Sequence, residues 1–204
     1  MLLVASPSVS LAESVLIDDF VNGVSPIWKE KEFKGQTSYE ALVEDGVPCL
    51  KAYAKGTASG LFYEVKYNPE KKPILTWKWK IDNIVEKGNA MTKAGDDYPA
   101  RIYVVFPSVF FWKTKALNYV WANQLAKGEA VANSYTSNAM MVAVESGGAN
   151  TGKWIEYRRN IYEDYKKYFG STPSKVGAIA VMTDTDTTGS EVSACYGPIF
   201  IQSE

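Results

Sequence analysis

The sequence predicts an all-β fold, an antiparallel β-sandwich with one short amphipathic helix. Short segments in which apolar and polar residues alternate recur along the chain, and turn-forming residues separate them. The thirteen Tyr, eight Phe and six Trp favour strands, because flat side chains pack well on a pleated surface. The chain shows no regular succession of strand and helix patterns, which argues against a parallel βαβ sheet.

The segment 73–81 has the clearest strand pattern. Trp77 and Trp79 fall on one face of an extended chain, whereas Lys78 and Lys80 fall on the other. Such alternation is typical of a strand with one face in the core and a solvated face opposite. We expect both tryptophans in the core, and an exposed platform for a sugar is the alternative.

Other strands are expected on the same grounds, with alternation at 50–55 and 61–66. Further strand candidates are 15–20, 38–43, 101–106, 139–145, 153–157, 176–182 and 191–201. The turns between them are predicted at Asp45-Gly46, Asn68-Pro69, Gly147-Gly148 and Thr188-Gly189.

Two stretches have a different pattern. The segment 115–127 fits either a strand or a helix. In 160–169, Ile161, Tyr165 and Phe169 recur at helical spacing, which predicts a short amphipathic helix lying on a sheet.

The chain of 204 residues has room for one domain, and its apolar fraction of 46% allows a sizeable core. We interpret residues 1–12 as the remnant of a signal peptide and 13–204 as a single β-sandwich domain. Ser10 and Ala12 are small residues at the −3 and −1 positions of a cleavage site before Glu13. The alternative is a disordered or strand-forming N-terminus.

The same segment bears on the membrane and the compartment. Its apolar run is shorter than the roughly 20 residues that span a bilayer, so we expect no integral membrane segment. A cleaved leader predicts a periplasmic or secreted protein.

The charged residues and the missing histidines exclude several classes of function. With 22 Lys and Arg against 23 Asp and Glu, the net charge is −1, which is not expected of a protein that binds nucleic acid or an anionic membrane. Without histidine, the chain cannot build a Ser-His-Asp or Cys-His nucleophile or a His-ligated zinc site. Any catalysis would depend on carboxylates, Tyr, Lys or a bound hard cation.

Cys49 and Cys195 are too few for a Cys-rich metal centre. An oxidising compartment would allow them to form a disulfide if the first and last thirds of the sandwich meet. Two buried free thiols are the alternative that we favour, because cysteine packs well as a small hydrophobe.

Two acidic clusters, each adjoining an apolar strand candidate, supply the candidate site. One contains Asp96, Asp97 and Arg101, and the other contains Asp184 and Asp186. Polar side chains at strand ends are where a β-domain can build a site on a rigid frame. We therefore expect Asp97, Arg101, Asp184 and Asp186 to meet in space, and we treat all five residues of the clusters as candidate ligand-binding residues.

A metal site is a weaker interpretation of the second cluster. Its alternating oxygens and its glycine resemble the first half of a calcium loop, but Cys195 stands where the twelfth-position acid is required. We assign no metal ligand and no cofactor, and calcium is the one cation considered, since the available ligands are hard oxygens. Arg101 would repel such an ion, so we expect it to pair with Asp184 or Asp186.

Two further explanations of the clusters stay open. In the structural one, the aspartates cap turns and Arg101 neutralises one of them. In the enzymatic one, two carboxylates act on a saccharide. No glutamate lies in a recognisable catalytic motif, so no catalytic residue is assigned and enzyme activity stays undecided.

Several motifs together resemble a known family. They are Ile17-Asp18-Asp19-Phe20 with Trp28, the segments 37–39, 59–61, 75–80 and 119–121, Trp154 with Arg159-Asn160, and both acidic clusters. This combination, which covers nearly the whole mature chain, resembles the bacterial family known as domain of unknown function 3047. The Asp-Asp-Phe opening and the closing strand are also similar to jelly-roll, galactose-binding-like domains. The resemblance implies a jelly-roll-like sandwich with a carbohydrate-facing or envelope-associated role, and it transfers no catalytic residue.

We therefore expect an exported ligand-binding β-sandwich whose ligand is a saccharide or another small molecule of glycan-like chemistry. One alternative is a carboxylate-dependent, glycoside-active enzyme. Another is a structural envelope protein that binds a protein partner through the region 107–121, where Phe110-Phe111-Trp112 forms an aromatic run.

Overall fold

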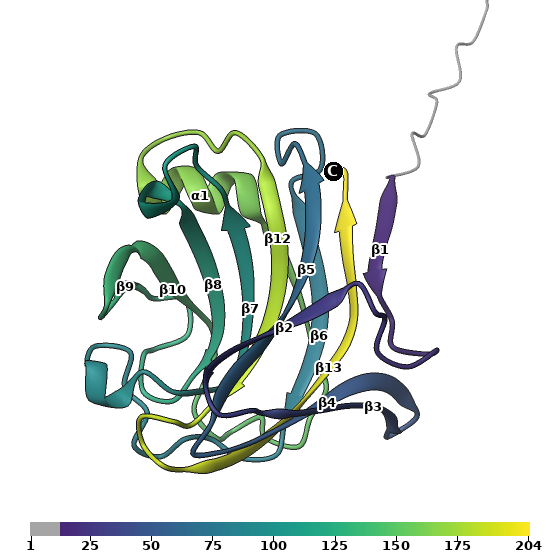
Figure 1. Cartoon of the computed structure of the whole chain (residues 1–204), viewed down its shortest axis with the longest axis vertical. Coiled ribbons are helices and arrows are strands. Elements are labelled where there is room, and N and C mark those ends of the chain that lie inside the picture. The colour runs from purple at the N-terminus through teal and green to yellow at the C-terminus, as the bar shows by residue number, and fades with distance from the viewer. Residues whose placement is uncertain (1–12) are drawn as a thin grey trace, which may run out of the picture.

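The structure, a computed structural model, describes residues 13–204 and consists of two β-sheets packed face to face, with one α-helix at one end (Figure 1). This arrangement is the all-β, jelly-roll-like sandwich that the sequence predicts. The expected signal-peptide remnant, residues 1–12, lies outside the described residues.

The first sheet has six strands, all paired antiparallel. Five of them follow the order β11 (Ile155–Asn160), β6 (Ile74–Ile81), β13 (Glu191–Gln202), β4 (Val47–Lys55) and β3 (Ser38–Glu44). The sixth, β1 (Ser14–Asp18), pairs with the last residues of β13.

The second sheet has seven strands and carries the candidate site. Their order is β2 (Trp28–Lys34), β5 (Ala58–Tyr67), β12 (Val176–Asp184), β7 (Tyr98–Phe106), β8 (Lys115–Ala122), β10 (Thr136–Ser146) and β9 (Ala130–Asn133). Neighbouring strands are antiparallel except for β8 and β10, which run parallel.

Alternation along each strand divides the residues between the core and the outer face of its sheet. On β7, Ile102 and Val104 belong to the core between the sheets, whereas Arg101 and Tyr103 point to the opposite face. The polar residues of the candidate site therefore lie on the outer side of a rigid, well-packed sheet.

Trp77 and Trp79 are core residues, as expected, with exposed fractions of 1% and 0%. The ring of Trp77 lies 5.2 Å from that of Tyr119 across the two sheets. The expectation of a simply solvated lysine face is wrong for Lys80. Its ammonium group contacts two acidic side chains, Glu44 at the end of β3 at 2.5 Å and Asp45 in the turn after it at 2.8 Å.

The helix α1 (Ile161–Phe169) matches the amphipathic pattern closely. The side chain of Asn160 caps its first turn by accepting a hydrogen bond from the Glu163 backbone N–H, and the left-handed Gly170 ends it. Ile161 and Tyr165 are buried against the sandwich, so burial of one helix face holds α1 in place.

The ambiguous segment 115–127 contains the strand β8, and two short strands were not expected. They are β2, which is mostly charged, and the four-residue β9. Both lie at edges of the second sheet, where one side of a strand needs no partner and the hydrophobic pattern is weak.

Cys49 and Cys195 are buried free thiols, the alternative that we favoured. They lie on the neighbouring strands β4 and β13, so the first and last thirds of the sandwich do meet. The Cys195 thiol donates a hydrogen bond to Glu44 Oε2 at 3.1 Å.

Candidate functional site

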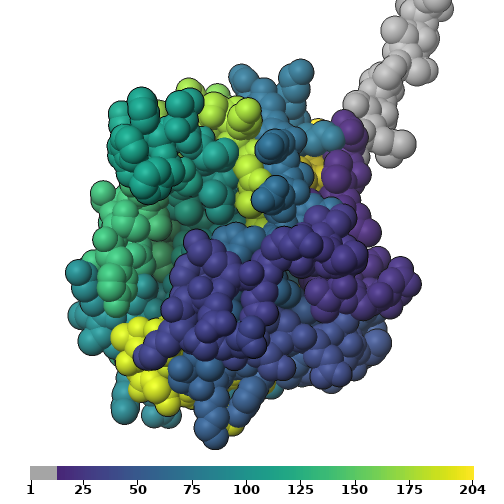
Figure 2. Space-filling model, in the orientation of Figure 1, coloured from purple at the N-terminus to yellow at the C-terminus, as the bar shows by residue number. Residues whose placement is uncertain are grey.

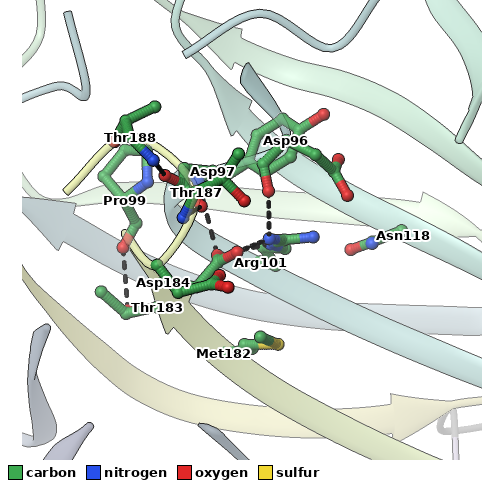
Figure 3. Close-up of polar contacts among 12 residues, drawn as sticks. Asp96, Asp97, Pro99, Arg101, Asn118, Met182, Thr183, Asp184, Thr187 and Thr188 are labelled. Carbon is green, nitrogen blue, oxygen red and sulfur yellow. Dashed lines mark hydrogen bonds and ion pairs between the residues drawn. The ribbon is translucent and has the colours of Figure 1, made fainter. Parts of the chain in front are cut away.

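An ion pair between β7 and β12 anchors the site. Arg101 Nε donates a hydrogen bond to Asp184 Oδ1 at 2.7 Å, and Arg101 Nη2 contacts Asp184 Oδ2 (Figure 3). Both residues are buried, and the two strands are hydrogen-bonded neighbours, so the pair is bidentate and held by the sheet. Of the two partners expected for Arg101, Asp184 and Asp186, the structure shows Asp184.

The remaining contacts of Arg101 complete its environment. Nη2 donates to the backbone carbonyl of Asp96 at 3.1 Å, and Nη1 donates to the hydroxyl of Tyr103 at 3.2 Å. The guanidinium carbon lies 4.4 Å from the centre of the Tyr98 ring. Each terminal nitrogen of the guanidinium thus has a partner, and the group is fixed in orientation.

Asp97 has a structural role beneath the site. Its carboxylate accepts hydrogen bonds from the backbone N–H groups of Thr187 and Thr188, at 3.2 and 2.6 Å. These contacts fasten the turn after β12 to the start of β7 (Figure 3). For Asp97, these contacts agree with the structural explanation of the acidic clusters.

Asp186 is the most loosely held of the four aspartates. Its carboxylate lies 4.0 Å from Lys34 Nζ, while that ammonium group donates a shorter bond of 2.7 Å to the Asp186 carbonyl. Partial burial, and next the negative charge of Asp97, raise the pKa of the Asp186 carboxyl above its usual value. A ligand that donates hydrogen bonds would find an acceptor here.

Asp97, Asp184 and Asp186 each place one carboxylate oxygen within 4.8 Å of the others. Two of these carboxylates already have strong partners, in Arg101 and in the turn after β12. A cation would have to displace the guanidinium or lie against it. The arrangement therefore fits a closed ion-pair network better than a calcium site.

Above this network, the outer face of the second sheet forms an open cavity of about 410 Å³. Its lining combines residues from both edges of the sheet: Phe33, Ala58, Asp96, Arg101, Tyr103, Asn118, Asn133, Tyr135, Ala139, Met182, Asp184, Asp186 and Thr187. Figure 2 shows the dark-blue β2 and the green β9–β10 segment flanking this recess.

The cavity exists because the sheet is curved. Phe33 lies on β2 and Asn133 on β9, the two edge strands of the seven-stranded sheet. In a flat sheet with about 4.8 Å between strands, such residues would be roughly 29 Å apart. They can line one cavity only if the sheet curls around it.

Asn118 is the most informative residue of this lining. It is 1% exposed, and its Oδ1 atom has no hydrogen-bond partner among residues 13–204. Its Nδ2 atom has only a weak acceptor, the sulfur of Met141, at 3.3 Å. A buried amide oxygen without a partner costs about 1–3 kcal/mol, so a donor from a ligand would relieve an existing cost.

All five sequence-predicted residues lie in this region. Asp96, Arg101, Asp184 and Asp186 line the cavity, and Asp97 lies beneath it. The Asp96 carboxylate accepts a hydrogen bond from Asn133 Nδ2 at 3.0 Å.

Sequence reasoning missed the residues that give the cavity its shape and its open acceptor: Phe33, Tyr103, Asn118, Asn133 and Tyr135. A polar residue inside the apolar run 116–122 was the one available signal for Asn118.

Fold and site together define a jelly-roll-like β-sandwich with an aromatic and polar cavity on the outer face of one sheet. The chain belongs to the family described as "Protein of unknown function (DUF3047)", which matches residues 26–200. No curated protein sequence matches the chain.

Several solved structures are similar in fold. The xyloglucanase domain of NopAA from Sinorhizobium fredii has a TM-score of 0.49 and 7% identity, over 89% of this chain and 97% of that one. A cellulase derived from Cel12A of Rhodothermus marinus has a TM-score of 0.47 and 8% identity, over 92% and 99%. At such low identity, these likenesses say nothing about what this protein binds.

A third similar structure is the glycoside hydrolase domain of Endo-D from Streptococcus pneumoniae R6. It has a TM-score of 0.44 and 11% identity over 85% of this chain, and the chain spans only 21% of that one.

Among the described residues, no helix is both long and apolar enough to cross a membrane.

Proposed function

We propose that this protein binds a glycan-like ligand in the cavity on the outer face of the seven-stranded sheet. The observation that carries the proposal is Asn118, a residue of the cavity lining whose buried amide oxygen has no partner among residues 13–204. A sugar hydroxyl can donate to such an oxygen and accept from a neighbouring donor at the same time.

The aromatic lining suits the apolar faces of sugar rings. Phe33 and Tyr135 have exposed rings at opposite sides of the cavity, and Tyr103 lies between them on β7. Flat side chains of this kind supply contact area at a low entropic cost, because they have few rotatable bonds. Small-molecule sites typically combine such rings with a few precisely placed polar groups.

Charge also bears on the choice of ligand. Arg101 is neutralised by Asp184, and Lys34 lies near Asp186. These charged groups of the cavity therefore already have partners of opposite charge. A neutral ligand rich in hydroxyl groups would disturb none of these pairs. The partly exposed Asp186 carboxylate offers a further acceptor at the rim.

The glycosidase alternative has less support. Retaining enzymes need carboxyl groups about 5–5.5 Å apart and inverting enzymes about 6.5–9.5 Å. Asp97 and Asp184, the two carboxylates that have an oxygen close to Asp186, are both held by other partners. The raised pKa of Asp186 suits a general acid, but this residue has no free second carboxylate among these three.

A glycan array followed by calorimetric titration tests the proposal. We expect binding without turnover, weakened about ten-fold, or about 1.4 kcal/mol, by Asn118→Leu. Asn83→Leu is the matched control, because Asn83 is exposed and lies outside the cavity. Tyr135→Ala should also weaken binding, whereas Tyr53→Ala, at another exposed tyrosine, should not.

Two results would contradict the proposal. The first is the absence of binding to any glycan by the parent protein. The second is binding that Asn118→Leu and Tyr135→Ala leave unchanged. Release of a shorter saccharide, abolished by Asp186→Asn, would favour the enzymatic alternative instead.

We further propose that the protein is exported, with Glu13 as the first residue of the mature chain. The support is the pair of small residues Ser10 and Ala12 after an apolar run. Intact-mass measurement of exported protein tests this, and a retained Met1 in that material would contradict it.

A further inference from the structure

The loop between β7 and β8 presents four consecutive apolar side chains to solvent. They are Val109, Phe110, Phe111 and Trp112, with exposed fractions between 51% and 97%. We call these four residues the aromatic tip. Figure 2 shows this teal loop at the upper left corner of the molecule, and Figure 1 places it beside α1. Such a run of exposed large hydrophobic residues marks an interaction surface.

Lysines surround the aromatic tip without acidic partners. Lys113 Nζ lies 5.5 Å from the centre of the Phe110 ring, and Lys115 Nζ lies 4.7 Å from that of Phe169. Lys113 and Lys175 are exposed. None of these three lysines forms an ion pair within the described part of the chain.

A second hollow, of about 480 Å³, lies at the base of the tip. Its polar lining consists of two ammonium groups and four hydroxyl groups, from Lys113, Lys175, Ser108, Thr172, Ser174 and Tyr165. No carboxylate from residues 13–204 lines it. Lysine ammonium and hydroxyl groups are donors that suit a phosphate, and a carboxylate would have opposed one.

We propose that this end of the sandwich docks on an anionic phospholipid bilayer. The aromatic tip enters the interfacial layer, where Trp and Phe side chains are favoured, and the hollow with Lys113 and Lys175 receives a lipid phosphate. The occupant is a bilayer because the same end carries both elements, an apolar tip and an adjoining phosphate-compatible hollow.

The whole-chain charge of −1 does not reveal this surface, because attraction to a membrane acts within a Debye length of about 10 Å. The lysines near the membrane surface decide whether this end is attracted, because each basic residue close to an anionic surface adds to the attraction. Docking of this kind is reversible and depends on salt, and it requires no membrane-spanning helix.

Vesicle flotation tests the proposal with the intact protein. We expect binding to vesicles of phosphatidylcholine mixed with phosphatidylglycerol and much weaker binding to phosphatidylcholine alone. Lys113→Gln combined with Lys175→Gln should weaken binding about thirty-fold, which is two contributions of about 1 kcal/mol each. Lys29→Gln combined with Lys87→Gln is the control, since it changes the net charge equally at exposed lysines elsewhere.

Tryptophan fluorescence gives a second, residue-specific measurement. The described residues contain all six tryptophans, and Trp112 is the exposed one, whereas the others are buried or half-buried. Adding the anionic vesicles should therefore shift the emission to shorter wavelength. Trp112→Phe should abolish that shift and keep most of the binding, while Phe111→Asp should weaken binding itself.

Several outcomes would overturn the proposal. Equal binding to both kinds of vesicle, or binding to neither, would do so, as would equal effects of the two double lysine variants. Stabilisation by inorganic phosphate without vesicle binding would assign the hollow to a free phosphate. Self-association that Phe111→Asp abolishes, without vesicle binding, would assign the tip to a second copy of the chain.

Discussion

Asp184→Asn should strongly destabilise the protein. The substitution removes the ion-pair partner of Arg101, whose guanidinium is buried, with an exposed fraction of 4% for the residue. It removes the charge from a bidentate pair whose Nε–Oδ1 distance is 2.7 Å. Breaking a buried ion pair from one side typically costs about 3–5 kcal/mol, because the remaining charge stays desolvated.

The remaining contacts of Arg101 place the expected cost at the lower end of that range. The guanidinium keeps its hydrogen bonds to the Asp96 carbonyl and the Tyr103 hydroxyl, and the Tyr98 ring at 4.4 Å still attracts it. We therefore expect a loss of about 3 kcal/mol, which corresponds to roughly 6–12 °C in Tm for a domain of this size.

Urea unfolding monitored by tryptophan fluorescence measures the loss, and a double-mutant cycle isolates the pair. Arg101→Met combined with Asp184→Asn removes both charges, so it should be more stable than Asp184→Asn alone. A loss below about 1 kcal/mol for Asp184→Asn, or a double variant that loses the sum of the single losses, would refute this reasoning.

Three further predictions follow from the core, the ion pairs and the acidic cluster. Trp77→Ala should cost roughly 3–5 kcal/mol in urea unfolding, and unchanged melting with lost sugar binding would indicate a binding platform instead. Although burial opposes it, the ion pairs with Lys80 and Lys51 lower the pKa of Glu44 from 4.5 to about 2. Because the folded-state pKa is the lower one, this stabilisation is present above pH 4.5 and is lost as the pH falls towards 2. Glu44→Gln should lack that part of the pH dependence, and an identical acid profile would contradict the assignment. Calcium should leave Tm unchanged, whereas a calcium-dependent rise that Asp186→Asn abolishes would show a cation site.

The sandwich and its core could be predicted because alternation is a local property of each strand. Trp77 and Trp79 needed only their neighbours in sequence to be assigned to the core. The charged strand β2 (Trp28–Lys34) shows why the rest could not, since its pairing with β5 is decided by the sheet and not by its own pattern. Edge strands carry the weakest hydrophobic signal and are therefore missed first.

The convergence of Arg101 and Asp184 was predictable for a similar reason. Both lie near the ends of apolar strands, and β7 and β12 pair directly, with Arg101 opposite Met182. The cavity was not predictable, because Phe33 and Asn133 meet only through the curvature of seven strands. Curvature arises from twist accumulated across the whole sheet, which no single segment encodes.

Some residues of the site stabilise the protein, whereas others are available to bind a ligand. Arg101 and Asp97 have their partners within the protein, so removing either should damage stability and reveal little about binding. Asn118 has the opposite character, because its buried oxygen lacks a partner and costs stability in the unliganded protein. Asn118→Leu should consequently weaken binding while leaving the free energy of unfolding unchanged or higher. A residue that is kept for function at a cost in stability loses binding but not stability when it is replaced. An asparagine with a purely structural role would instead lose stability on replacement.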